Sequence, residues 1–149
     1  MEIFLKSIQK KFISEKGREI QVLKNVDEVI KNEEFIVLIG PSGCGKSTLL
    51  NIIAGLEKCT SGEVIVGGKK IINPSRDRGM VFQQDALLMW RKVIDNVEYG
   101  LELSGIKKNE RRKIALEHLE KVGLEKFADF YPKDLSGGMR KRVQIASVF

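Results

Sequence analysis

The chain has 149 residues, of which 42% are hydrophobic and 31% charged, a composition typical of a globular domain and not of fibrous or disordered chains. No apolar run approaches the roughly 20 residues that a membrane-spanning helix needs, and the start lacks the pattern of a secretory signal, so we expect a cytoplasmic protein. The net charge of +6 has its densest cluster at 107–113 without interleaved aromatic residues, which indicates a solvated helix face, and no nucleic-acid partner is expected.

Short β patterns occupy the first part of the chain. Residues 3–8 and 20–26 have β-type patterns, and the polar stretch 14–17 between them is typical of a turn. We therefore expect an antiparallel layer at the N-terminus.

The segment 35–39, Phe-Ile-Val-Leu-Ile, is apolar without alternation. Such a run is typical of a parallel strand covered on both faces, so we predict that it is the central strand of the core sheet. The sequence Gly-Pro-Ser-Gly-Cys-Gly-Lys-Ser-Thr follows at 40–48, and apolar residues then recur at helical spacing as far as Leu56, with Gly55 as the predicted helix end. The predicted order is strand, glycine loop, helix.

A second hairpin is predicted farther along the chain. The segments 63–66 and 69–72 flank Gly67 and Gly68, and a tight turn of this kind needs positive φ at both central residues. The segment 79–82 is another short strand candidate.

From residue 93 onward the pattern is helical. Helices are predicted over 93–104, ended by Gly105, and over 109–122, ended by Gly123. A last helix is predicted to begin at Ser136.

The segment from Gly40 to Ser47 matches G-x-x-x-x-G-K-[ST] in full. Its glycines let successive backbone N–H groups point at phosphate oxygens, and the following helix adds the positive end of its dipole. Lys46 supplies a cation for the β- and γ-phosphates, and the Ser47 hydroxyl can ligate Mg²⁺. The motif predicts nucleotide binding, and the alternative of a plain glycine-rich turn is disfavoured by the strand and helix on either side. A small-molecule kinase, a GTPase and a transport ATPase all remain open.

A second glycine-rich motif opens the last predicted helix. Ser136 is an N-cap candidate, and Gly137 and Gly138 leave the first turn without side chains, so another molecule can approach its N–H groups. Taken alone, the segment fits a capped helix without a ligand equally well.

Together, the loop and the sequence Leu-Ser-Gly-Gly at 135–138 resemble the Walker A and signature motifs of ATP-binding-cassette (ABC) transporter ATPases. Phe82-Gln83 is similar to the family's Q-loop, and the sequences at 77–83, 86–90 and 95–97 resemble the nitrate, sulfonate and taurine importer branch.

The resemblance covers essentially the whole chain and implies an α/β fold, the N-terminal part of a P-loop NTPase of the ABC ATPase type. Its parts would be an antiparallel β layer, a phosphate-loop strand and helix, and a helical subdomain, with an incomplete core sheet. The β layer, phosphate-loop core and Q-loop would occupy 1–92, and the helical subdomain with the signature helix 93–149.

The resemblance also implies ATP and Mg²⁺ as cofactors, bound between two subunits that form a head-to-tail dimer. Gln83 would contact Mg²⁺ and the attacking water, Ser47 would ligate the metal, and Phe12 would stack on adenine, with a buried structural aromatic as the alternative for Phe12. The other nucleotide-binding residues would be Gly40, Pro41, Ser42, Gly43, Cys44, Gly45, Lys46, Thr48 and, in trans, Ser136, Gly137 and Gly138. A transmembrane permease would be the further partner and would hold the protein on the cytoplasmic face of the inner membrane.

The chain departs from the family pattern at four positions. Glu33 stands where Gly is common, Met89 where this branch often has Pro, Lys141 where Gln is usual and Ser147 where Arg is usual. We expect the first two changes to be tolerated in loops, and Lys141 to weaken contacts beside the signature motif without abolishing them.

The chain ends inside the predicted signature helix, before the positions of the family's Walker B Asp, catalytic Glu, D-loop and switch His. We therefore expect that this polypeptide by itself does not turn over ATP. We also expect 35–39 to be left with an unpaired edge and bare apolar side chains, and the chain to be marginally stable and prone to aggregation.

The leading hypothesis is an ATP-binding subunit that couples ATP hydrolysis to solute uptake. A non-catalytic remnant that at most binds nucleotide or a permease is one alternative. A soluble phosphate-loop kinase is another, disfavoured by the second glycine motif. ABC proteins that act on DNA or ribosomes are a closer rival, since they share both motifs. Those that act on DNA through long coiled coils would need a heptad insertion between the two motifs, and 83–136 contains none.

Overall fold

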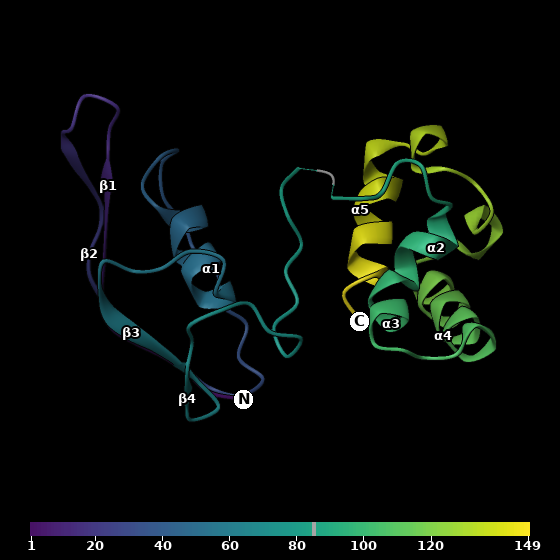
Figure 1. The fold of residues 1–149 in the computed structure, drawn as a ribbon, viewed down its shortest axis with the longest axis horizontal. Coiled ribbons are helices and arrows are strands. Elements are labelled where there is room, and N and C mark those ends of the chain that lie inside the picture. The colour runs from purple at the N-terminus through teal and green to yellow at the C-terminus, as the bar shows by residue number, and fades with distance from the viewer. Residues whose placement is uncertain (85) are drawn as a thin grey trace. The chain divides into compact units, whose positions relative to one another are not determined.

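A computed structural model describes residues 1–84 and 86–149. The chain forms two compact units, Met1–Arg78 and Gly79–Phe149, each with its own hydrophobic core (Figure 1). The division predicted from the sequence, into parts 1–92 and 93–149 of a nucleotide-binding domain, stays a prediction.

The N-terminal unit is built on one antiparallel sheet with the strand order β2-β1-β3-β4. Its strands are β1 (Ile3–Ile13), β2 (Glu19–Ile30), β3 (Ser61–Val66) and β4 (Lys69–Lys70). The predicted antiparallel layer and both hairpins are confirmed. Strands β1 and β2 are longer than predicted because their ladder runs from the Ile3–Ile30 pair to the Ile13–Glu19 pair, whereas β4 ends at Lys70.

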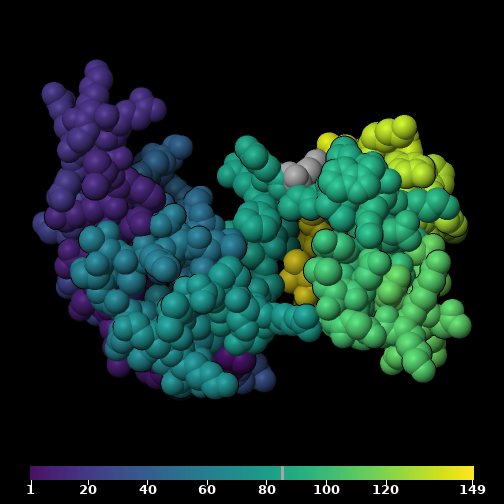
Figure 2. All heavy atoms as spheres, viewed as in Figure 1, coloured from purple at the N-terminus to yellow at the C-terminus, as the bar shows by residue number. Residues whose placement is uncertain are grey.

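The β1–β2 hairpin extends beyond the rest of the sheet. Strand β3 pairs with β1 only between Ile3 and Gln9, so the outer end of the hairpin is two-stranded and Ile13 is 76% exposed. Figure 2 shows this end, in purple, standing clear of the rest of the N-terminal unit. The polar turn at its tip, with Gly17 donating its N–H to the Ser14 carbonyl, lies where the sequence predicts it.

Helix α1 (Lys46–Ala54) buries one face in the core of the N-terminal unit. Its C-cap is Gly55 at φ 79°, a left-handed conformation that glycine adopts without strain. The predicted helix and its predicted end are therefore confirmed. The buried members of this core are Leu5, Ile8, Leu23, Leu49, Ile52, Val64 and Val66.

Two predicted strands do not form. The segment 35–39 has no strand hydrogen bonds, and Phe35 and Ile39 at its ends are 90% and 91% exposed. The segment 79–82 is likewise irregular. A strand needs a neighbour to bond with, and no described residue pairs with either segment. The prediction of a central strand at 35–39 is wrong for this structure, while the prediction of an unpaired apolar segment is confirmed.

The C-terminal unit is helical. It contains α2 (Val93–Val97), α3 (Tyr99–Leu103), α4 (Lys108–Lys121), the 3₁₀ turns η1 (Glu125–Phe127) and η2 (Pro132–Asp134), and α5 (Gly137–Ala146). The predicted helices over 109–122 and from Ser136 are confirmed. The helix predicted over 93–104 is two short helices that meet at Glu98. None of the helices in the described part of the chain has the length and apolarity that a bilayer span requires.

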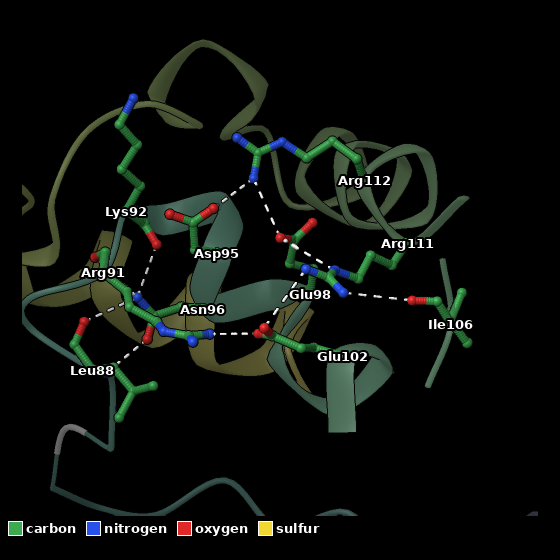
Figure 3. A network of polar contacts seen from close by, with 10 residues as sticks. All are labelled: Leu88, Arg91, Lys92, Asp95, Asn96, Glu98, Glu102, Ile106, Arg111 and Arg112. Carbon is green, nitrogen blue, oxygen red and sulfur yellow. Dashed lines mark hydrogen bonds and ion pairs between the residues drawn. The ribbon is translucent and has the colours of Figure 1, made fainter. Parts of the chain in front are cut away.

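Charged side chains join α2 and α3 to α4 (Figure 3). Glu98 is 3% exposed, and its carboxylate lies 3.5 Å from both Arg111 Nε and Arg112 Nη1. Arg112 also contacts Asp95 at 2.6 Å, and Arg111 lies 3.6 Å from Glu102. A carboxylate buried this deeply requires opposite charges around it, and Arg111 and Arg112 of α4 supply them.

Asn96 closes the loop that precedes α2. Its side chain is buried, accepts a hydrogen bond from the Leu88 N–H at 2.6 Å and donates to the carbonyls of Leu88, Arg91 and Lys92. Its two N–H donors are shared among three carbonyls, so this one amide makes hydrogen bonds to four backbone groups of the turn that precedes α2.

Candidate nucleotide-binding site

The glycine loop between 40 and 45 depends on residues that have no side chain. Gly43 has φ 81° and Gly45 has φ 97°, conformations that other residues adopt only with strain. A Cβ on Gly45 would also lie 2.8 Å from Leu23 Cδ2 and 3.0 Å from the Val22 carbonyl oxygen. Gly45 is therefore required both by its backbone conformation and by the close approach of the loop to β2.

The side chain of Lys46 folds back over the loop. Its Nζ donates to the carbonyl oxygens of Gly40 at 2.8 Å and Pro41 at 2.7 Å, and it lies 3.5 Å from the Cys44 sulfur. The ammonium group is held at the loop by neutral acceptors, and a phosphate would be a stronger, charge-assisted partner.

The start of α1 suits an anion. The N-cap, Gly45, has no side chain that could bond the first N–H groups, and no acidic residue lies in the first turn. Ser47 is exposed in that turn. Free N–H groups, a helix dipole and a nearby lysine together form an anion-binding arrangement. The predicted phosphate-binding residues 40–48 thus lie in one continuous loop and helix start.

A divalent cation fits this site only together with a phosphate. Among residues 1–84 and 86–149 there is no group of three or more His, Cys, Asp or Glu side chains that could hold a metal ion. The exposed Ser47 hydroxyl is one oxygen ligand, and Mg²⁺ is usually held by few protein groups together with phosphate oxygens and water. The residues present fit Mg²⁺ that arrives with a nucleotide.

Phe12 lies near the outer end of β1, opposite Ile20. Its side chain is 39% exposed, so the alternative of an ordinary buried aromatic does not describe it. The Lys10 ammonium lies 4.7 Å from the ring centroid. Lys10 also donates to Glu57 at 2.6 Å, and this hydrogen bond holds the pKa of Glu57 below its ordinary value.

The second glycine motif forms the capped start of α5. Ser136 is the N-cap, and its Oγ accepts a hydrogen bond from the Met139 N–H at 3.3 Å. Gly137 and Gly138 are exposed; a Cβ on Gly138 would meet no atom within 4 Å, and one on Gly137 would meet only Arg140 Nη2 at 3.8 Å. Neither glycine has positive φ. The packing of this unit therefore gives no reason for two glycines at this helix start.

Gln83 is exposed in the irregular segment before α2. Its carbonyl oxygen accepts a hydrogen bond at 3.1 Å from Lys141 on α5. The structure thus brings Gln83 to the helix that begins at Ser136, while residues 40–48 belong to the N-terminal unit. The sequence patterns do not predict this contact, although Lys141 stands out in the sequence as a departure from the family pattern.

The other departures lie at different kinds of position. Glu33 has φ 62°, the left-handed region that favours glycine. Met89 is exposed, and the Ser147 hydroxyl donates to the Gln144 carbonyl at 2.8 Å at the end of α5.

One unit has a glycine loop that leads into a helix packed on an antiparallel layer, and the other is helical and has a helix that begins with two glycines. These features define a phosphate-loop protein of the cassette class. The family described as "ABC transporter" matches residues 23–149. The chain belongs to this family.

Individual relatives agree with this assignment. The chain is 52% identical to an uncharacterized ABC transporter ATP-binding protein of Methanocaldococcus jannaschii, over 87% of this chain and 49% of that protein. It is 49% identical to a taurine import ATP-binding protein of Rhizobium johnstonii, over 91% and 52% of the two chains. A nitrate import ATP-binding protein of Synechocystis is 44% identical over 98% and 54%. The chain spans about half the length of these curated relatives.

Solved structures confirm the fold class. An ATP-binding cassette solved as a dimer in a post-hydrolysis state, bound to ADP and Pi, matches with a TM-score of 0.89 and 39% identity, over 99% of this chain and 68% of that chain. A second dimeric structure, of a bacterial ABC transporter cassette, matches with the same TM-score and 40% identity. The chain has the α/β fold of the N-terminal part of an ABC ATPase.

Proposed function

We propose that the chain is part of the ATP-binding subunit of an ABC importer, which couples ATP binding and hydrolysis to solute uptake. The observation that carries the proposal is the Lys46 ammonium held over the glycine loop at the start of α1. The names of the taurine and nitrate import relatives support an importer of that branch.

In this proposal residues 40–48 bind the phosphates of ATP. Backbone N–H groups at the start of α1 face the phosphate oxygens, and Lys46 exchanges its carbonyl partners for the β- and γ-phosphates. Ser47 and Gln83 hold Mg²⁺, Gln83 contacts the attacking water and Phe12 stacks on adenine. Bound ATP supplies the free energy of its hydrolysis to the transport cycle.

The helix start at Ser136 serves a second subunit. Gly137 and Gly138 keep the first turn of α5 bare, and nothing in the described packing requires glycine there. We propose that this turn binds the γ-phosphate held by the partner subunit in a head-to-tail dimer. A transmembrane permease is the other partner, and it holds the subunit at the cytoplasmic face of the inner membrane.

Titration calorimetry with Mg-ATP tests the proposal. Loss of the Lys46 ammonium removes charge-assisted hydrogen bonds worth about 1.5–3 kcal/mol, so Lys46→Ala should weaken binding by roughly 10- to 100-fold. Lys16→Ala, in the exposed turn between β1 and β2, is the matched control and should bind like the unchanged chain. Equal affinities in all three chains, each shown by circular dichroism to be folded, would refute nucleotide binding at this loop.

A further inference from the structure

Two residues of α5 hold the backbone of the irregular segment 82–84. The Lys141 ammonium donates to the carbonyl oxygens of Phe82 and Gln83 and to the Gln144 side-chain oxygen at 3.0 Å. Gln144 Nε2 in turn donates to the Gln84 carbonyl at 3.3 Å. Lys141 and Gln144 are three residues apart on one helix face, so they act on neighbouring points of the segment.

These contacts use the full donor capacity of the lysine. An ammonium group has three N–H donors, and here three acceptors surround it. Gln144 is 4% exposed, and breaking the hydrogen bonds of a buried amide costs free energy because water cannot replace the lost partners. Segment 82–84 belongs to no helix or strand. Its carbonyls therefore accept hydrogen bonds from side chains of α5 in place of those that a neighbouring strand would donate.

The hydrogen bonds from Lys141 and Gln144 to segment 82–84, named the tie below, link two functional elements of the proposed ATPase. Gln83 is the residue proposed to contact Mg²⁺ in the site of its own subunit, and α5 begins with Ser136–Gly138, proposed to reach the site of the partner subunit. A rigid link between them makes the Q-loop and the signature helix one structural element. Binding at either ATP site would then influence the position of this element.

We propose that Lys141 is a positioning residue that fixes the Q-loop backbone at Gln83 to the signature helix, so that Gln83 is oriented for Mg²⁺-bound ATP. The inference rests on the proposed function for the role of Gln83, whereas the tie itself is a property of the C-terminal unit. Arginine at this position keeps the charge and the donors, so Lys141→Arg should preserve the hydrogen bonds to Phe82 and Gln83. Lys141→Ala should remove both and leave segment 82–84 held only by the Gln144 bond to Gln84.

The tie is measured first without nucleotide, by the distance between two spin labels on the full chain. The labels are placed at Gln84→Cys and at Glu117→Cys, exposed positions on the segment and on α4, after Cys44 and Cys59 are replaced by Ser. Lys141→Ala should broaden the distance distribution, and Lys141→Arg and the exposed-site control Lys113→Ala should leave it narrow. An unchanged distribution in Lys141→Ala would overturn the inference.

Binding of ATP is then measured with Mg²⁺ and with EDTA, on chains that keep their native cysteines. Lys141→Ala should weaken Mg-ATP binding by roughly tenfold or more, as loss of a hydrogen bond to a charged group does, and leave metal-free ATP binding unchanged. Equal losses of ATP affinity in both buffers would overturn the inference that Lys141 positions Gln83. A chain in which the labels respond as expected, but the unmutated protein binds no ATP at all, would refute the proposed function and the role of Gln83 with it.

Discussion

The sulfur of Cys44 lies 3.5 Å from the ammonium nitrogen of Lys46 inside the glycine loop. Cys44 is exposed, whereas Cys59 is only partly exposed. A group attached to Cys44 would occupy the space beside the Lys46 ammonium. Alkylation of this one thiol is therefore expected to interfere with any phosphate that uses Lys46.

Iodoacetamide should modify Cys44 before Cys59 and weaken Mg-ATP binding by roughly 10- to 100-fold, the effect expected from disrupting charge-assisted hydrogen bonds. Peptide mass spectrometry gives the modified position, and titration calorimetry the affinity. A Cys44→Ser chain treated in the same way is the control and should keep its affinity. Full affinity in a chain alkylated at Cys44 would contradict the phosphate site.

Gly138→Ala should leave the fold intact. Because a Cβ there meets nothing within 4 Å and alanine favours helix over glycine by up to about 1 kcal/mol, the free energy of unfolding should stay level or rise. Ser136→Ala, which removes the N-cap, should lower it by about 1 kcal/mol. Urea unfolding followed by circular dichroism checks both values. A loss above about 1 kcal/mol in Gly138→Ala would mean that this glycine is structural after all.

Glu33→Gly should stabilise the N-terminal unit. Glu33 is the third residue of a turn closed by the hydrogen bond from Glu34 N to the Lys31 carbonyl, and its φ is 62°. A left-handed non-glycine residue costs about 1–2 kcal/mol, and the entropy that glycine gains in the unfolded chain offsets part of this. The expected net gain is about 0.5–1 kcal/mol in the free energy of unfolding by urea. Glu33→Ala carries the same backbone strain and should gain nothing.

The segment 35–39 should drive self-association. Its apolar side chains are exposed and its backbone groups are unpaired, and such an edge is a template for aggregation. Replacing Phe35 and Val37 with lysine should reduce light scattering at equal protein concentration. A single lysine at the exposed Asn109 of α4, which adds charge elsewhere, should have much less effect, and equal effects would assign aggregation to net charge alone.

The C-terminal unit should lose stability in acid. The Arg91 hydrogen bond to Glu102, 2.7 Å long, lowers the pKa of that carboxyl from its ordinary value near 4.5. A lowered pKa in the folded state means that the contribution of Glu102 is complete above pH 4.5 and is lost as the pH falls through the folded-state value. Urea unfolding at pH 7 and between pH 5 and 3 measures the loss. Glu102→Gln should show a shallower fall over that range than the unmutated chain does.

Local patterns were enough to predict the antiparallel layer, the glycine loop and the helix ends. Gly55 ends α1 in a left-handed conformation, and Ser136 caps α5 through its own hydroxyl, because both effects depend on residues within one turn. The apolar run at 35–39 predicts a strand, but strand formation depends on a neighbouring strand, which the local pattern does not contain.

The sequence by itself determined the family and the residues that form the phosphate loop, because a loop of this kind is made by consecutive residues whose backbone conformations are set locally. Only the tertiary structure decided that α2 and α3 meet at a buried Glu98, and that Lys141 holds the carbonyl of Gln83. Both depend on side chains from another helix: the buried carboxylate of Glu98 needs the opposite charges of Arg111 and Arg112 on α4, and the Gln83 carbonyl accepts its hydrogen bond from Lys141 on α5.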